Sequence, residues 1–123
     1  MDMGSLSFTD LDVWKRAHQA TLAVYKITKS FPSDERFGLT QQMRKAAFSI
    51  PANIAEGFGR RQPRDKAHFY VISKGSLEEL RYYLILARDL GYMADSNELA
   101  GLLDDTARML NRLYSSTVGG SRS

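Results

Sequence analysis

Residues 49–64 read SIPANIAEGFGRRQPR, and this stretch decides how the fold is interpreted. It places Pro51 inside a segment whose apolar residues otherwise repeat with helical spacing. A proline in a helix interior lacks a backbone donor and its ring crowds the preceding turn, at a cost of about 3 kcal/mol. Two interpretations stay open: a helix kinked at Pro51, where small residues permit close approach to a neighbour, or a true break with Ser49 capping a new helix.

Outward from this stretch, apolar residues recur at three- and four-residue steps along almost the whole chain. The pattern predicts helices over 10–30, 34–62, 64–90 and 96–116, followed by a flexible Ser/Gly-rich tail. No segment resembles a strand, and the connections are short, which places consecutive helices antiparallel. The sequence therefore predicts a single all-α domain of 123 residues, an antiparallel up-down-up-down four-helix bundle.

Start signals accompany the first and fourth helices. Thr9 followed by Asp12, and Asp95 followed by Glu98, resemble the capping boxes that open helices. Trp14, near the start of the first helix, is expected to lie in the core or in an interface. For the second helix, the predicted core face comprises Leu39, Met43, Ala46, Ile50, Ile54 and Gly57.

The third helix carries two apolar stripes. The predicted core stripe comprises Phe69, Ile72, Ser76, Leu80, Tyr83, Leu84, Ala87 and Leu90. The opposite side carries Val71, Gly75, Tyr82, Ile85 and Leu86. An outer apolar stripe usually marks an interaction surface. An interface between copies of the chain is therefore predicted at Val71, Tyr82, Ile85, Leu86 and part of the face of the second helix that carries Pro51. Scattered surface hydrophobic residues are the alternative interpretation.

A narrow polar stripe runs along the second helix and includes Ser49, Asn53 and Glu56. Glu56 stands four residues before Arg60, a spacing typical of an ion pair on a helix surface. The stripe is also a candidate contact for a partner helix.

Positive charge is concentrated at one place. The net charge is +3, yet residues 60–74 alone carry five basic residues and a single acidic one. Arg60, Arg61, Arg64 and Lys66 surround the turn between the second and third helices. Because Lys and Arg neutralise phosphates, these four residues are a candidate nucleic-acid-binding cluster.

The sequence contains no pattern typical of several common classes of functional site. The chain has no Cys, which excludes disulfides, thiolate metal sites and cysteine nucleophiles and favours a cytoplasmic protein. No apolar run is long enough to span a bilayer, and the first residues lack the pattern of a signal peptide. His18 and His68 have no pattern of metal-ligating partners, and no nucleophile, base and orienting group occur together. The sequence therefore predicts no enzyme activity, no cofactor and no metal.

A resemblance to a known family rests on spaced motifs. The first helix carries Asp10, Leu11, Val13, Trp14 and Ala17, and the next block carries Phe31, Pro32, Glu35, Phe37, Gly38, Leu39, Gln42 and Arg44. The most specific motif comprises Ser49, Ile50, Pro51, Asn53, Ile54, Ala55, Glu56 and Gly57. Further matches are Gly75, Ser76, Leu77, Glu79 and Leu80, then residues 89–92. With these motifs the chain resembles the bacterial-type 23S rRNA intervening sequence proteins.

The resemblance implies small four-helix bundles arranged as a homopentamer around a central axis. It also implies a distant relationship to the accessory variability determinant proteins of diversity-generating retroelements, which are barrel-like pentamers that bind nucleic acid and a reverse transcriptase. No firm biochemical activity accompanies the family.

Two functions follow as hypotheses. The first is a non-enzymatic, ring-like homo-oligomeric scaffold that binds structured RNA or another nucleic acid through its basic turns. The alternative is a protein-interaction module without nucleic-acid affinity, in which the polar stripe and the apolar patches engage a partner protein.

Overall fold

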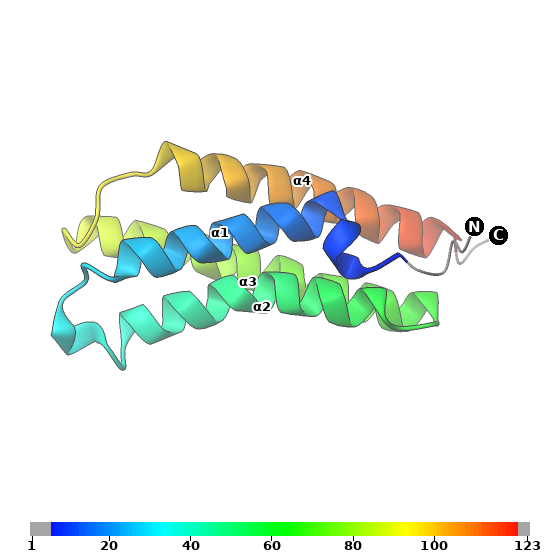
Figure 1. Cartoon of the computed structure of the whole chain (residues 1–123), viewed down its shortest axis with the longest axis horizontal. Helices are drawn as coiled ribbons and strands as arrows, with labels where there is room; N and C mark the ends of the chain where they lie inside the picture. Colours follow the sequence, from blue (N-terminus) through cyan, green and yellow to red (C-terminus); the bar gives the residue numbers. More distant parts are fainter. Residues whose placement is uncertain (1–5, 121–123) are drawn as a thin grey trace.

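The computed structural model describes residues 6–120, and this part of the chain is entirely helical apart from its connections (Figure 1). The α-helices and short 3-10 helices are η2 (Phe8–Asp10), α1 (Asp12–Thr28), η3 (Ser33–Glu35), α2 (Leu39–Phe58), α3 (Pro63–Asp89) and α4 (Asn97–Gly120). No strand occurs within residues 6–120. The prediction of an all-α four-helix bundle is therefore confirmed.

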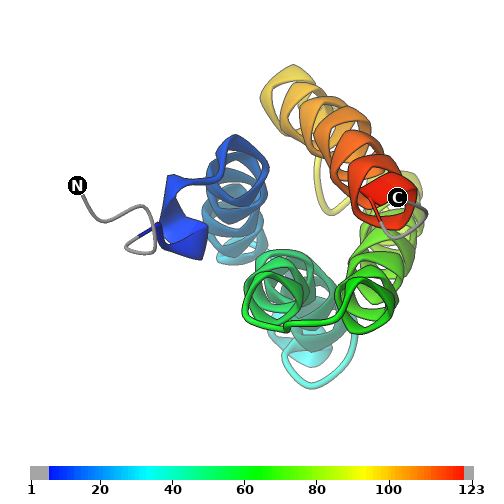
Figure 2. The ribbon, with the colours of Figure 1, turned by 90° about the vertical axis from the view of Figure 1, so that its right-hand side faces the viewer.

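Each long helix packs against two others. α1 contacts α2 and α4, and α3 contacts the same two helices from the other side, as the end-on view shows (Figure 2). The most extensive contact joins α2 and α3, while η2 lies against α1 and α2. Within residues 6–120, no helix is both long and apolar enough to cross a bilayer.

The core lies where the four helices face one another. Its fully buried large side chains come from every helix: Val24, Met43, Ile50, Ile54, Tyr70, Leu77, Leu80, Leu99, Leu103 and Leu110. The predicted core face of α2 is confirmed, because every one of its six members is buried. Trp14 is partly buried against this core, with its ring 5.3 Å edge-on from Phe8 and 5.0 Å from His18 in a stacked pair.

Pro51 lies inside a continuous α2, so the interpretation of a broken helix is wrong. The carbonyl of Ala47 is the group that loses its helical donor to proline. The buried hydroxyl of Thr21 on α1 lies 3.1 Å from that carbonyl and 2.9 Å from the carbonyl of Ala17, and its proton can serve either acceptor. A side chain on the neighbouring helix thus satisfies the acceptor that proline leaves open.

The first two predicted helices are too long. The expected helix over 10–30 divides into η2 and α1, because the capping box at this end pairs Ser7 with Asp10 and closes a separate 3-10 turn. The expected helix over 34–62 starts five residues late and ends at Phe58. Its start is displaced because the carboxylate of Glu35 accepts a hydrogen bond from the backbone N–H of Leu39 at 3.0 Å.

The last two helices also differ at their ends. Pro63 opens α3, one residue earlier than expected, because proline suits the first helical position. α4 begins after Ser96, whose hydroxyl accepts from the N–H of Leu99, rather than after Asp95. α4 includes residues 117–120, so the predicted tail after residue 116 is wrong as far as Gly120, and residues 121–123 lie outside the described part.

The buried stripe of α3 is displaced from the predicted one. Its buried members are Ala67, Tyr70, Ser73, Leu77, Leu80 and Ala87, whereas Ile72 and Leu90 are exposed. Two contacts with α2 explain the rotation. A side chain on Gly57 would collide with the ring of Tyr70, so glycine makes room for that ring, and the hydroxyl of Ser73 donates to the carbonyl of Ile50 at 2.9 Å. Small residues let α2 and α3 approach closely, which single-helix periodicity does not reveal.

Candidate nucleic-acid interface

The basic turn joins the end of α2 to the start of α3. α2 ends at Phe58, four residues connect the helices, and Pro63 fixes the first turn of α3. This arrangement brings Arg60, Arg61, Arg64 and Lys66 to one end of the α2–α3 pair. The structure therefore places the four predicted cations together, but it gives them different roles.

Lys66 caps α2. Its ammonium group donates to the carbonyl of Phe58 at 2.8 Å and lies 3.4 Å from the carbonyl of Gly57. It also lies 5.5 Å from the centre of the Phe58 ring. Carbonyls at the end of a helix lack intrahelical donors and carry partial negative charge, so a cation here stabilises the fold. The ammonium group of Lys66 is therefore committed to the protein itself.

Arg60 is held by an acidic neighbour. Its guanidinium donates to the Glu56 carboxylate at 2.7 Å and lies 4.7 Å from the centre of the Phe69 ring. The i,i+4 ion pair expected between Glu56 and Arg60 is confirmed. Because both side chains are about half exposed, this pair adds little stability, yet it neutralises much of the charge of Arg60.

Arg61 and Arg64 are the cations that the fold leaves available. Both are exposed, and neither forms an ion pair with another residue in the described part of the chain. Arg64 shares an open depression with Gln62, Pro63, Asp65 and His68. The sequence interpretation assigned His68 no role, although its spacing of four residues from Arg64 places both on one face of α3.

The polar stripe of α2 is used mainly within the bundle. The amide of Asn53 donates to the carbonyl of Ser49 at 2.8 Å and contacts the Ser49 hydroxyl at 2.9 Å. That hydroxyl in turn lies 2.8 Å from the hydroxyl of Ser76 on α3. Ser49 therefore forms part of the α2–α3 contact and Asn53 bonds to Ser49, whereas Glu56 is about half exposed and pairs with Arg60.

The outer face of α3 is apolar and open. Val71, Tyr82 and Ile85 are 50%, 56% and 48% exposed, and a side chain on Gly75 would meet nothing within 4 Å. Two predicted interface residues do not join them. Pro51 is buried within α2, and Leu86 packs against the core, because each faces a neighbouring helix of its own chain.

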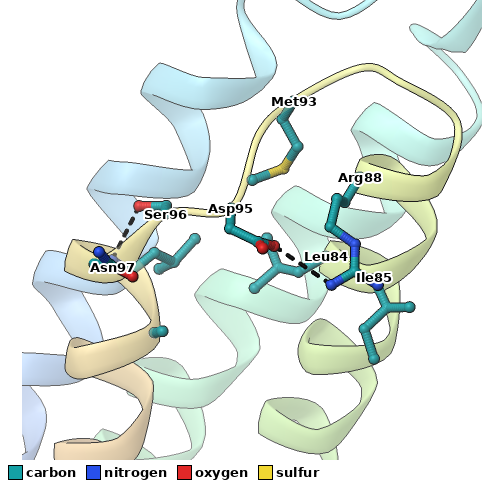
Figure 3. Close-up of a pocket in the computed structure, with 9 residues that line it drawn as sticks. Leu84, Ile85, Arg88, Met93, Asp95, Ser96 and Asn97 are labelled. Carbon is teal, nitrogen blue, oxygen red and sulfur yellow. Dashed lines mark hydrogen bonds and ion pairs between the residues drawn. The ribbon is translucent and has the colours of Figure 1, made fainter.

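A small pocket lies where α3 passes into α4 (Figure 3). Its volume is about 230 Å³, and Leu84, Ile85 and Met93 supply apolar walls. The two charged residues that line it pair with each other, since Arg88 lies 3.4 Å from Asp95 (Figure 3). Arg88 also lies 3.1 Å from Asp89, which is outside the lining. The hydrogen bond that Arg88 donates to Asp89, together with the charges of both carboxylates, raises the pKa of Arg88 above its ordinary value. The pocket offers no uncompensated charge to a ligand.

No candidate metal site occurs among the described residues. No three His, Asp or Glu side chains gather closely enough to hold an ion between residues 6 and 120. Asp65 and His68 line the same depression, but two such ligands do not make a structural metal site.

Comparison with known proteins agrees with the motifs. The family model described as 23S rRNA-intervening sequence protein matches residues 9–112, which covers most of the chain. A search among curated proteins finds no match. The matched region includes most of η2, all of α1 to α3 and most of α4, so it contains both the basic turn and most of the bundle. The chain therefore belongs to the 23S rRNA-intervening sequence protein family.

Proposed function

We propose that this protein is a non-enzymatic cytoplasmic scaffold that assembles from several copies of itself and binds structured RNA through its α2–α3 turns. The observation that carries the proposal is the pair Arg61 and Arg64, exposed beside a well-packed helix pair and without a carboxylate partner in residues 6–120. Neutralising a phosphate releases condensed counterions, so available cations on a rigid support suit the RNA backbone.

Assembly strengthens this proposal. Two arginines bind phosphates weakly, but a ring repeats the pair once per subunit, and later contacts then form at a high effective concentration. Affinity rises without new chemistry in any one subunit. Because these contacts are made to the phosphate backbone of the RNA, the preference for particular RNA sequences should be weak.

The subunit proposed for the ring is an antiparallel up-down-up-down bundle, and five subunits follow from the resemblance to pentameric proteins. The exposed apolar residues Val71, Tyr82 and Ile85 on α3 support a self-association surface, and Gly75 between them permits close approach.

Light scattering after size exclusion tests the assembly. The parent is expected to give an oligomeric mass at micromolar concentration, and Tyr82→Glu/Ile85→Glu is expected to give monomers. Leu22→Glu/Leu90→Glu is the matched control, because these side chains are 56% and 50% exposed on other surfaces. A monomeric parent would contradict the assembly, and an intact oligomer of the first variant would show that another surface associates.

Fluorescence anisotropy with a labelled RNA hairpin tests the binding. Arg61→Glu/Arg64→Glu is expected to lower affinity by roughly tenfold or more while helicity and oligomer mass stay unchanged. Lys15→Glu/Arg112→Glu changes the net charge equally on the exposed faces of α1 and α4 and should have a much smaller effect. If the parent does not bind at low salt, or both variants bind as the parent does, a protein partner becomes the better account.

A further inference from the structure

A second group of cations lies far from the basic turn, beside the segment that connects α1 to α2 (Figure 1, cyan). We name it the basic-aromatic groove. Its volume is about 340 Å³, and it is lined by Tyr25, Arg36, Phe37, Thr40, Gln41, Arg44, Lys45 and Phe48. It includes the first half of α2, whereas the basic turn follows the last residue of that helix. The two sites are therefore separate.

The groove contains three cations and no carboxylate. None of Arg36, Arg44 and Lys45 forms an ion pair with any residue between 6 and 120. The connecting 3-10 helix carries the carboxylates of Asp34 and Glu35, neither of which lines the groove. The carboxylate of Glu35 is already engaged. One of its oxygens accepts from the N–H of Leu39 at 3.0 Å, and the other accepts from the Tyr92 hydroxyl at 2.8 Å.

Arg44 is held in place without being neutralised. Its Nε donates to the hydroxyl of Thr28 at 2.8 Å, and its guanidinium lies 4.7 Å from the centre of the Tyr25 ring. Both partners are uncharged, so the positive charge remains available to a ligand. A cation fixed by neutral contacts loses little conformational entropy when an anion binds.

Aromatic faces surround these charges. Phe37 is 81% exposed, Phe48 46% and Tyr25 37%, so three rings at one groove are only partly covered by their own chain. The guanidinium of Arg36 lies 5.6 Å from the centre of the Phe37 ring, which places charge beside the most exposed ring. Exposed phenylalanine rings gain free energy when a flat apolar group covers them.

The combination selects one class of ligand. An apolar protein surface would cover the rings but would also bury three cations without partners, which is strongly unfavourable. An acidic peptide would pair with the cations but would leave the rings in water. Single-stranded nucleic acid supplies both components, because its unpaired bases stack on aromatic side chains and its phosphates bind Arg and Lys.

We propose that the basic-aromatic groove binds single-stranded nucleic acid, with bases stacked on Phe37 and Phe48 and phosphates held at Arg36, Arg44 and Lys45. This inference does not depend on the basic turn. The turn offers cations for the backbone of structured RNA, whereas the groove requires exposed base faces. The ligand chemistry is common to RNA and DNA, so the test includes both.

The test uses the full chain and three labelled probes of equal length: an oligouridine, an oligothymidine and an RNA duplex. The parent is expected to bind the two single strands. Phe37→Ala/Phe48→Ala should weaken single-strand binding at least about tenfold and change duplex binding by less than about threefold. Leu6→Ala/Ile72→Ala is the matched control, because it shortens side chains that are 61% and 39% exposed elsewhere, and it should bind as the parent does.

A second variant, Arg36→Gln/Lys45→Gln, should weaken single-strand binding and reduce its salt dependence. If the variant weakens binding of oligouridine and of oligothymidine equally, the groove recognises the chemistry that RNA and DNA share. A stronger effect on one probe would identify RNA or DNA as the ligand. The inference is overturned if the parent binds neither single strand at low salt, or if the phenylalanine variant binds both as tightly as the parent. It is also overturned if that variant changes the oligomer mass and not the binding, because the groove would then be a contact between copies.

Discussion

The basic turn and the basic-aromatic groove both gather cations beside aromatic rings, but their charges have different neighbours. At the turn, Arg60 is paired with Glu56, and Lys66 donates to the carbonyls at the end of α2. At the groove, Arg44 is held by a hydroxyl and a ring, and no lining residue is acidic. The turn therefore offers fewer unpaired cations than its sequence suggests, whereas the groove offers more than its sequence suggests.

This difference teaches that a charge must be traced to its partners before it is assigned to a ligand. A cation that donates to the last carbonyls of a helix already stabilises the fold, so its removal mainly changes stability. A cation paired with an exposed carboxylate adds little stability but is partly compensated, whereas removal of an unpaired surface cation mainly changes binding.

The largest expected effect is on the stability of the protein, and it comes from a residue of the basic turn. Lys66→Met removes the cation that caps α2, and we expect the free energy of unfolding to fall by about 2 kcal/mol. Arg61→Met, the matched control, should change it by less than about 0.5 kcal/mol because Arg61 is exposed. Urea denaturation followed by circular dichroism measures both. Equal losses would show that the two cations do not differ as described.

The next effect concerns which nucleic acid each region binds. Arg61→Glu/Arg64→Glu should weaken binding of an RNA hairpin by roughly tenfold and binding of oligouridine by less than about threefold. Phe37→Ala/Phe48→Ala should show the reverse pattern. Competition of the two probes against each parent and variant measures this separation. If either variant weakens both probes equally, the regions are parts of one surface.

A smaller effect follows from the Glu35 carboxylate, which accepts hydrogen bonds at the start of α2. The backbone N–H of Leu39 and then the Tyr92 hydroxyl lower the pKa of Glu35, because both hydrogen bonds favour the ionised form. A lowered pKa in the folded state contributes stability above the ordinary pKa of the carboxyl, and this contribution disappears as pH falls through the lowered value. Glu35→Gln should therefore be less stable than the parent at pH 7, by less than Lys66→Met.

Thermal denaturation at pH 7 and pH 3 measures this dependence. The difference in melting temperature between the parent and Glu35→Gln should shrink from pH 7 to pH 3, because protonation of the carboxyl removes the contribution of its ionised form as pH falls toward the lowered pKa. Glu98→Gln, on an exposed position in the first turn of α4, serves as the control for the loss of one carboxylate. An equal difference at both pH values would contradict the proposed role of Glu35.

The smallest expected effect is a mutation that raises affinity for RNA instead of lowering it. Glu56→Gln releases Arg60 from its ion pair, so affinity for the RNA hairpin should rise about twofold to threefold. Stability should change by less than about 0.5 kcal/mol because the pair is exposed. Glu78→Gln, which also removes one exposed carboxylate from an ion pair, should raise affinity less because it lies further along α3. Anisotropy titration detects both changes, and a lower affinity for Glu56→Gln would contradict the account.

Much of the fold could be predicted from sequence, because apolar spacing identifies helices and the core face of α2. The rotation of α3 could not, because it depends on Tyr70 entering the space above Gly57 and on Ser73 bonding to another helix. At Pro51, likewise, the hydroxyl that lies within hydrogen-bonding distance of the Ala47 carbonyl belongs to Thr21 on α1. In each case the deciding contact joins residues distant in the chain.

The two basic regions show the same limit. The cluster at the turn can be read from sequence because its cations are adjacent, but the partners of Lys66 cannot, because they are backbone carbonyls at the end of α2. The groove was missed because its members come from α1, the connecting segment and α2, so no short window of sequence contains them. Tyr25 and Arg44 are 19 positions apart yet lie 4.7 Å from ring centre to guanidinium.

The most direct test of the difference between available and committed cations is the salt dependence of RNA binding. The logarithm of affinity for one RNA hairpin would be measured against the logarithm of salt concentration for the parent, Arg61→Gln/Arg64→Gln and Arg60→Gln/Lys66→Gln. The two variants remove the same charge from the same turn, and both would be measured where circular dichroism shows them folded. We predict that the slope flattens for Arg61→Gln/Arg64→Gln, because fewer phosphates are neutralised, and stays close to the parent value for Arg60→Gln/Lys66→Gln. Equal flattening in both variants, or flattening in the second alone, would contradict the account.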